Sequence, residues 1–165
     1  FQAHHDQLTG LPNRHYFYNK LLNIFDNPQY RHNSALLLID NNKFKAINDE
    51  YGHLAGDAVL KEMATRLGQS VRHEDFIARL GGDEFAIILH TPHHADHLQA
   101  IAEVLLGSCK EPLDFNGQLI HFGFSVGIAF SHFAENPEDL VMQADQAMYK
   151  AKNLNPHWFL YKPEI

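Results

Sequence analysis

A pair of glycines followed by two acidic residues, set between two apolar runs, is the feature that most limits how this chain can fold. Residues 79–85 read Arg-Leu-Gly-Gly-Asp-Glu-Phe. The flanking segments 76–80 and 85–89 are rich in β-branched and aromatic residues, and a glycine pair between such runs is a strong signal for a β-hairpin. We therefore expect two antiparallel strands with Asp83 and Glu84 at the exposed tip. Acidic residues also occur at hairpin turns without any further role.

The composition fits a single domain. The chain has 165 residues, of which 45% are hydrophobic and 12 are phenylalanine, so it can bury one sizeable core. Its formal charge of −7 gives no overall attraction to nucleic acid or to an anionic membrane, and we expect neither as a partner. Cys109 is the only cysteine, which excludes an internal disulfide and is compatible with a reducing compartment.

The start of the sequence indicates a piece of a larger protein. The chain begins at Phe1 rather than at methionine, and it contains no apolar stretch approaching the roughly 20 residues that a membrane-spanning helix needs. We expect one domain over residues 1–165, with residues 1–6 as the end of an upstream linker. We also expect a cytoplasmic location, within a parent protein that can itself be membrane-anchored.

Hydrophobic periodicity predicts the remaining elements. A continuous apolar run over 34–39 predicts a buried strand that ends at Asp40. Apolar residues at helical spacing, together with turn and capping signals, predict further helices and strands. The expected helices run from the turn at 11–13 to about residue 25, over 44–51, 55–71 and 93–106, and from Pro137 to about residue 151, and the further strands lie within 119–130 and 159–161. This order predicts an α+β fold of the ferredoxin-like type, with a mainly antiparallel central sheet flanked by helices.

Carboxylates at two of these elements suggest chemistry assisted by a metal. Mg²⁺ that acts on phosphates is held by oxygen ligands, and carboxylates from separate segments must converge on it. Asp40 ends a buried strand, and Asp83 and Glu84 lie on the hairpin. They converge if the strand and the hairpin are neighbours in the sheet.

Two polar residues suit recognition of guanine. The base presents N1–H and N2–H₂ donors beside the O6 acceptor, so a selective site needs a carboxylate and an amide. Asn48 and Asp57 supply these groups. The alternative is that Asp57 interacts with a helix dipole and Asn48 is a solvated helix residue. Leu60, one turn after Asp57, is either a packing surface for the base or a core residue.

Together these motifs resemble the GGDEF domain family, the diguanylate cyclases. The resemblance is carried by the segments 6–14, 40–49, 48–57, 81–85 and 140–152. It implies a nucleotidyl-cyclase-like fold and the condensation of two GTP into cyclic di-GMP with release of pyrophosphate. It further implies a homodimer that holds one GTP on each domain, and Mg²⁺ as cofactor, with Mn²⁺ as an alternative.

The resemblance also implies a role for each matching residue. The implied metal ligands are Asp40, Asn41, Asp83 and Glu84, and the implied catalytic residues are Asp83, Glu84 and Lys45. The implied GTP-binding residues are Phe44, Lys45, Asn48, Asp57, Leu60, Gly81, Gly82 and Lys152. Arg72 and Asp75 match an Arg-x-x-Asp motif for product inhibition, in which an arginine suits phosphate or a guanine face and an aspartate suits a guanine edge.

Departures from the family pattern leave other functions open. Asn42 replaces an aspartate, Pro156 stands where most members have an arginine that touches phosphate, and no Lys or Arg occurs between 85 and 109 to add a second arginine to the product site. We therefore expect weakened binding of GTP and of cyclic di-GMP. The alternatives are an inactive GTP-binding module that regulates an attached EAL-type phosphodiesterase, and a cyclic di-GMP receptor acting through Arg72 and Asp75. An attached sensor domain, an attached EAL domain or both are expected.

The histidines allow one further hypothesis. His93 and His97 have the i, i+4 spacing that zinc sites use, although a solvated helix face explains the same spacing.

Overall fold

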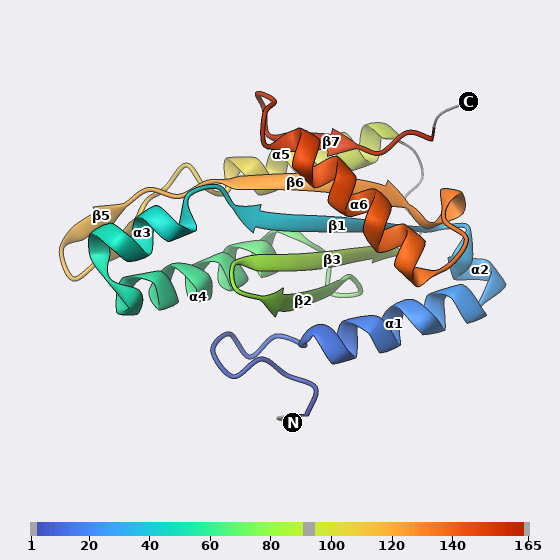
Figure 1. Cartoon of the computed structure of the whole chain (residues 1–165), viewed down its shortest axis with the longest axis horizontal. Coiled ribbons are helices and arrows are strands. Elements are labelled where there is room, and N and C mark those ends of the chain that lie inside the picture. Colours follow the sequence, from blue (N-terminus) through green and yellow to red (C-terminus); the bar gives the residue numbers. More distant parts are fainter. Residues whose placement is uncertain (1–2, 91–94, 164–165) are drawn as a thin grey trace.

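A five-stranded sheet forms the centre of the computed structural model, which describes residues 3–90 and 95–163 (Figure 1). The strand order is β2-β3-β1-β6-β7, and every neighbouring pair is antiparallel except β6 and β7. The strands are β1 (Ser34–Asn41), β2 (Phe76–Gly81), β3 (Glu84–His90), β6 (Phe124–Phe130) and β7 (Trp158–Leu160). The predicted α+β class with a mainly antiparallel sheet is confirmed.

Helices cover both faces of this sheet (Figure 1). They are α1 (Arg14–Asp26), α2 (Pro28–Arg31), α3 (Phe44–Tyr51), α4 (His53–Ser70), α5 (Ala95–Gly107) and α6 (Pro137–Ala151). Because side chains alternate along a strand, β1 serves two cores. Leu36 and Leu38 pack with residues of α1 and α6, whereas Leu37 and Ile39 pack with residues of α4 and α5.

Most predicted elements lie within a few residues of their expected positions. Helix α4 begins at His53 rather than at residue 55, and positions 93 and 94 of the expected fourth helix, including the His93 of the zinc hypothesis, lie outside the described residues. Asn13 and Asn136 cap α1 and α6 by accepting hydrogen bonds from main-chain N–H groups. The region 119–130 contains two strands, β6 and most of the short β5 (Gln118–Ile120). The elements not predicted are α2, the strand β4 (Leu113–Phe115) that forms a hairpin with β5, and the 3₁₀ turn η1 (Ser131–Phe133).

The segment before α1 is tied to the sheet. His5 forms a bridge with Pro12, and the Pro12 carbonyl accepts a hydrogen bond of 2.9 Å from the main-chain N–H of Arg79 in β2. Residues 4–13 therefore pack as part of the domain. That residues 1–6 also end a linker stays a prediction. Within 3–90 and 95–163, no helix is long and apolar enough to cross a membrane.

Candidate functional site

The acidic residues singled out in the sequence meet at one end of the sheet. The pairing of β1 with β3 places Asp40 directly opposite Glu84, and Asp83 immediately precedes Glu84 in the hairpin turn. Residues opposite each other in antiparallel strands share a face, with Cβ atoms about 4.5–5.5 Å apart. The condition that the strand and the hairpin must be neighbours is therefore met.

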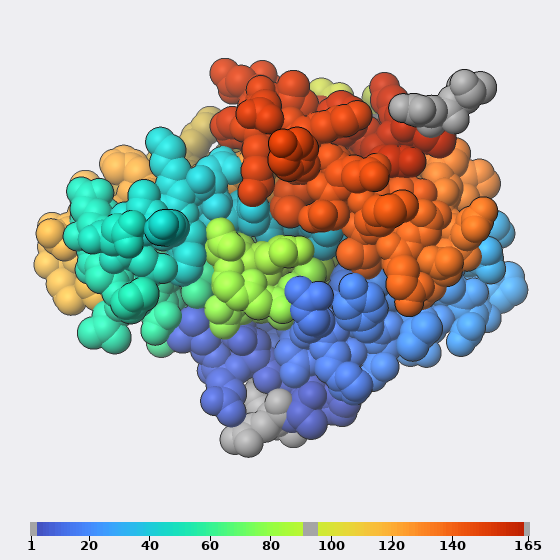
Figure 2. Space-filling model, viewed as in Figure 1, coloured from blue at the N-terminus to red at the C-terminus, as the bar shows by residue number. Residues whose placement is uncertain are grey.

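The turn between β2 and β3 depends on its two glycines. Gly81 has φ +142° and Gly82 has φ +51°, conformations that residues with a side chain adopt only with strain. Arg79 donates from Nε and Nη2 to the Gly82 carbonyl, at 3.1 and 2.8 Å. Asp83 in the turn and Glu84, the first residue of β3, are both half-buried, and the exposed residues of the turn are Gly81 and Gly82. The prediction that both carboxylates lie at an exposed tip is therefore wrong, because they point back toward the end of β1. Figure 2 shows the turn at the surface between α3, α1 and α6.

Asp40 is a buried carboxylate with one unsatisfied oxygen. Its residue is 8% exposed. Lys152, just after α6, donates from Nζ to Asp40 Oδ2 at 2.7 Å, while Oδ1 is buried without a hydrogen-bond partner among the described residues. Burial raises the pKa of Asp40 above its ordinary value, with the charge of Lys152 opposing it. An unsatisfied buried oxygen is costly in a folded protein and points to a ligand.

The charged groups around Asp40 also shift the pKa values of Glu84 and Lys152. Burial raises the pKa of Glu84, and the charges of Asp145, Asp40 and Asp83 add to this rise. The hydrogen bond to Asp40 raises the pKa of Lys152. The cluster therefore favours an ammonium at Lys152 and disfavours several simultaneous negative charges without a further cation.

An open cleft of about 620 Å³ lies over these groups. It is lined by Asp40, Asn41, Asn42, Lys43, Phe44, Lys45, Ala46, Asp49, Asp83 and Lys152. Lysines thus flank the carboxylates, from the start of α3 on one side and the end of α6 on the other. This combination suits a polyphosphate, because the ammonium groups neutralise phosphate oxygens and the carboxylates hold the cation that accompanies them.

The donor set fits Mg²⁺ bound together with phosphates. Within the described residues, no three Asp, Glu, His or Cys side chains converge closely enough to hold a metal ion by themselves. Mg²⁺ is usually bound by one or two carboxylates with waters and substrate phosphates completing the shell. Asp40, with its unsatisfied Oδ1, and Asp83 are the groups that suit such an ion.

The two asparagines after Asp40 use their side chains within the fold. Asn41 is 4% exposed, and its Oδ1 accepts the Lys43 N–H at 3.0 Å. A metal-binding role of Asn41 would therefore fall to its main-chain carbonyl, and it stays a prediction. Asn42 donates from Nδ2 to the Phe124 carbonyl at 3.1 Å, and its Oδ1 accepts from the Ser125 hydroxyl. An ionised aspartate has no donor for the Phe124 carbonyl. The asparagine at position 42 therefore makes a contact to β6 that the family's aspartate could not make, and it also lacks that aspartate's charge.

The predicted guanine-binding residues lie where α3 meets α4. The Asn48 side chain rests on Gly56, where an added Cβ would lie 1.8 Å from Asn48 Oδ1. Asp57 follows Gly56 and is exposed, so both polar groups lie at one corner of the molecule. Leu60 is only 3% exposed and packs in the core, which favours the core alternative for its side chain.

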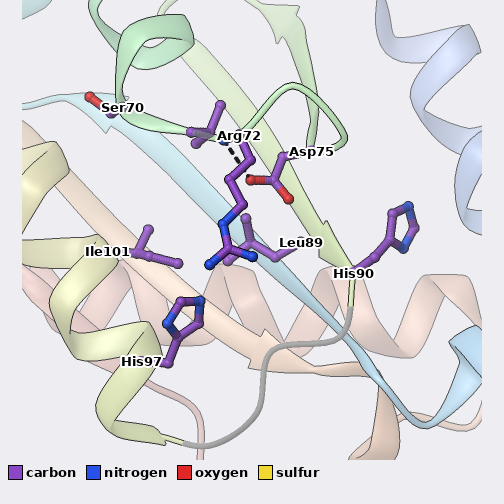
Figure 3. A pocket seen from close by; sticks show the side chains of 8 residues that line it. Ser70, Arg72, Asp75, Leu89, His90, His97 and Ile101 are labelled. Atoms are coloured by element: carbon purple, nitrogen blue, oxygen red, sulfur yellow. Dashed lines mark hydrogen bonds between the residues drawn. The ribbon is translucent and has the colours of Figure 1, made fainter.

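Arg72 and Asp75 lie at a different place, in the turn between α4 and β2. Asp75 accepts a hydrogen bond of 2.9 Å from the main-chain N–H of Arg72 (Figure 3). Burial raises the pKa of Asp75, opposed by this hydrogen bond. The two side chains line a hollow of about 80 Å³ that shares no lining residue with the cleft.

Comparison with known proteins decides the family. Residues 3–156 match the family model described as "Diguanylate cyclase, GGDEF domain". The chain belongs to the GGDEF family. It is 41% identical over 154 residues to the diguanylate cyclase TpbB of Pseudomonas aeruginosa, covering 92% of this chain and 35% of that protein. It thus spans about a third of this curated relative.

Solved GGDEF structures share the fold. A structure comprising only the GGDEF domain of Pseudomonas aeruginosa TpbB superposes with a TM-score of 0.87 and 38% identity, covering 96% of this chain and 95% of that one. The coiled coil and GGDEF domain of DgcB from Caulobacter crescentus, in complex with c-di-GMP, gives a TM-score of 0.82 and 27% identity, covering 92% and 81%. The nucleotidyl-cyclase-like form of the sheet predicted from sequence is confirmed by the GGDEF structures.

Several residues around the GGDEF turn were not predicted from the sequence. Arg14 donates from Nε to the Leu80 carbonyl at 3.1 Å. Asp145 acts electrostatically on the cluster, and Lys43 lines the cleft. The only signal for Asp145 was its separation of seven residues from Lys152, which is about two helical turns and places Asp145 on the side of α6 from which Lys152 follows. Arg79 was part of the motif, but its contacts depend on the packing of the N-terminal segment.

Asp6 connects that segment to the GGDEF turn through Arg79. Its Oδ2 accepts from the Thr9 N–H and hydroxyl, and its Oδ1 accepts from Arg79 Nη1 at 2.9 Å. Burial by itself raises the pKa of Asp6, but the hydrogen bonds from Thr9 and the charge of Arg79 outweigh it and leave the pKa below its ordinary value. Arg79 also donates to the Gly82 carbonyl, so these hydrogen bonds connect the N-terminal segment to the GGDEF turn.

Asp6→Asn is expected to lower the melting temperature by about 3–6 °C at pH 7, from the loss of roughly 1.5 kcal/mol of charge-assisted hydrogen bonding. A carboxylate with a depressed pKa stabilises the fold above its unfolded pKa, and this stability is lost as the pH falls through the folded value. The difference in melting temperature between wild type and Asp6→Asn should therefore become smaller below about pH 4. Thermal unfolding followed by circular dichroism between pH 7 and 3 measures it, and a difference that stays constant over this range would contradict the assignment.

Proposed function

We propose that this chain is a diguanylate cyclase domain that condenses two GTP into cyclic di-GMP with release of pyrophosphate. The observation that carries the proposal is the cleft at the end of β1, where the buried, unsatisfied oxygen of Asp40 lies beside the GGDEF turn and is flanked by lysines. Membership of the GGDEF family and the relative named as a diguanylate cyclase support it. The enzyme is proposed to work as a homodimer in the cytoplasm.

The residues of the cleft divide into two groups by charge. Asp40 and Asp83 would hold Mg²⁺, with the Asn41 carbonyl and Glu84 as further oxygen donors. When bound, this ion supplies positive charge to the triphosphate and to the departing pyrophosphate. Lys45 and Lys152 bind phosphate oxygens, and we add Lys43 to them because it lines the same cleft. Main-chain N–H groups at the start of α3, around Phe44, add donors of the kind that bind phosphate.

The bond changes follow from the product. The 3′-oxygen of one GTP attacks the α-phosphorus of the other, forming a new P–O bond. The bond from the α-phosphorus to the bridging oxygen of the β-phosphate breaks, and pyrophosphate leaves with its electron pair. The proton of the 3′-hydroxyl passes to a base, a role that Glu84 can take as the alternative to binding the ion, because burial raises its pKa. The 3′-oxygen of the second GTP then attacks the α-phosphorus of the first in the same way and closes the ring. Two domains must therefore face each other.

Asn48 and Asp57 select guanine in this proposal. Asn48 is held against Gly56, and the exposed carboxylate of Asp57 lies beside it. The amide donates a hydrogen bond to the O6 acceptor, and the carboxylate accepts hydrogen bonds from the N1–H and N2–H₂ donors. Gly81 and Gly82 allow the triphosphate to approach the main chain of the turn without interference from a side chain.

The product is proposed to bind a second time, at Arg72 and Asp75, as an inhibitor. The separate hollow at these residues supports a second site, as does the binding of c-di-GMP by the GGDEF protein DgcB. Sensor or EAL-type domains attached in the parent protein are consistent with a chain that spans about a third of TpbB.

Product analysis tests the proposal. The domain, and a version dimerised by a fused coiled coil, are incubated with GTP and Mg²⁺ and the nucleotides are separated by chromatography. Formation of cyclic di-GMP that disappears in Asp83→Ala is expected. GTP binding without any product from the forced dimer would instead favour the inactive regulatory module. Binding of cyclic di-GMP alone, sensitive to Arg72→Ala but not to Asp83→Ala, would favour the receptor.

A further inference from the structure

The hollow beside Arg72 has a wall that the sequence motif does not include. Its lining residues come from the end of α4, the turn before β2, the end of β3 and helix α5. Helix α5 contributes His97 and Ile101, which are four residues apart and therefore lie on one face of the helix. Figure 3 shows the Arg72 side chain extending across the hollow toward His97.

The chemistry of the hollow suits an anionic group. Arg72 and His97 present nitrogen atoms from opposite walls. Val71, Leu89 and Ile101 supply the apolar part of the lining, beside the polar Ser70 and His90. Asp75, the carboxylate of this lining, accepts the main-chain N–H of Arg72 and so holds the turn. A volume of about 80 Å³ admits one phosphate or one ring rather than a whole dinucleotide.

Arg72 is free to turn toward a ligand at little cost. Its guanidinium lies 4.0 Å from the Glu74 carboxylate, and both side chains are about two-thirds exposed, at 65% and 64%. Exposed ion pairs of this kind contribute little to stability. A phosphate between Arg72 and His97 would replace this weak pair by a charge-assisted hydrogen bond, which is stronger.

We propose that His97 is the second phosphate-binding residue of this site, donating from its imidazole to the phosphodiester that Arg72 binds from the opposite wall. The inference rests on the proposed product site. It also changes the expectation drawn from the sequence. The segment between residues 85 and 109 contains no Lys or Arg, which predicted a site without a second donor from the helix after the hairpin, and His97 supplies that donor from α5.

Isothermal titration of the domain with cyclic di-GMP tests the inference. Arg72→Ala is expected to abolish binding, and His97→Ala to raise the dissociation constant about tenfold, as for one lost hydrogen bond to a charged group. His97→Arg, which keeps a donor, is expected to bind at least as tightly as wild type. Gln99→Ala serves as the matched control, because Gln99 is exposed on the same helix and does not line this hollow.

Different failures lead to different conclusions. Binding that is lost in Arg72→Ala but unchanged in His97→Ala would overturn the role of His97 and leave the product site standing. A wild-type domain that does not bind cyclic di-GMP, or binds it independently of Arg72, would overturn the product site and the role of His97 together. GTP turnover, measured separately, tests the proposed cyclase activity. If His97→Ala does not fold, His97→Leu decides in its place, since leucine keeps most of the side-chain volume but has no donor. The same rise of about tenfold in the dissociation constant is expected, and an unchanged affinity would overturn the role of His97.

Discussion

Asp40→Asn is expected to reduce formation of cyclic di-GMP about 10³-fold while changing the melting temperature by only a few degrees. Activity falls because the amide has no negative charge to hold a metal ion at the cleft that Asp40 lines. Stability changes little because two effects oppose each other. The variant loses the ion pair with Lys152, but it also removes a charge that is costly to bury, as the raised pKa of Asp40 indicates.

Two measurements on the same protein separate these effects. Product formation from GTP and Mg²⁺ reports the metal site, and thermal unfolding without nucleotide reports the fold. Asp26→Asn is the matched control, since it makes the same chemical change at an exposed residue at the end of α1 and should leave both values near wild type. Retention of more than about a tenth of wild-type turnover by Asp40→Asn would contradict the assignment of Asp40 as a metal ligand.

The hairpin and the strand before it could be predicted from the sequence because each signal is local. The glycine pair requires a turn, and the apolar runs on either side of it can only be strands. The run that ends at Asp40 is too short for a buried helix and too apolar for a surface. Once these strands pair, Asp40 and Glu84 face each other, so the core of the candidate site follows from local pattern and one pairing.

The elements that were missed have weak local signals. Helix α2 has four residues, too few to show a helical period. The hairpin of β4 and β5 has strands of only three residues, although Asn116 and Gly117 at its turn form a dipeptide typical of hairpins. That dipeptide is the one local signal for this hairpin in the sequence.

The parts of the site that could not be predicted are contacts between distant segments. Lys152 reaches Asp40 only because α6 crosses the sheet beside β1, and Arg79 holds the GGDEF turn while pairing with Asp6 from the N-terminal segment. The roles of Asn42 and His97 likewise depend on what lies opposite them, which is β6 in one case and the turn before β2 in the other. Spacing along the chain carries no information about such contacts.

Gly127→Ala is expected to lower the free energy of unfolding by about 3 kcal/mol or more, the largest stability effect that we predict. Gly127 lies in β6, where α6 packs directly onto the strand. An added Cβ would lie 2.2 Å from the Met148 nitrogen and 2.4 Å from the Ala144 carbonyl oxygen, and neither main-chain atom can move without the helix. Displacement of α6 would also carry Lys152 away from Asp40, so turnover should fall together with stability.

Urea denaturation measures the first effect, and Gly68→Ala is the matched control. Gly68 lies within α4, and an added Cβ there meets no atom within 4 Å. The same chemical change at that position should raise stability by about 0.5–1 kcal/mol, because alanine favours the helix over glycine. Opposite signs for the two variants would show that α6 packs too closely on β6 to admit a methyl group at Gly127. Equal stability of Gly127→Ala and wild type would mean that α6 reaches its position by other contacts, since the strand would then tolerate the extra methyl group.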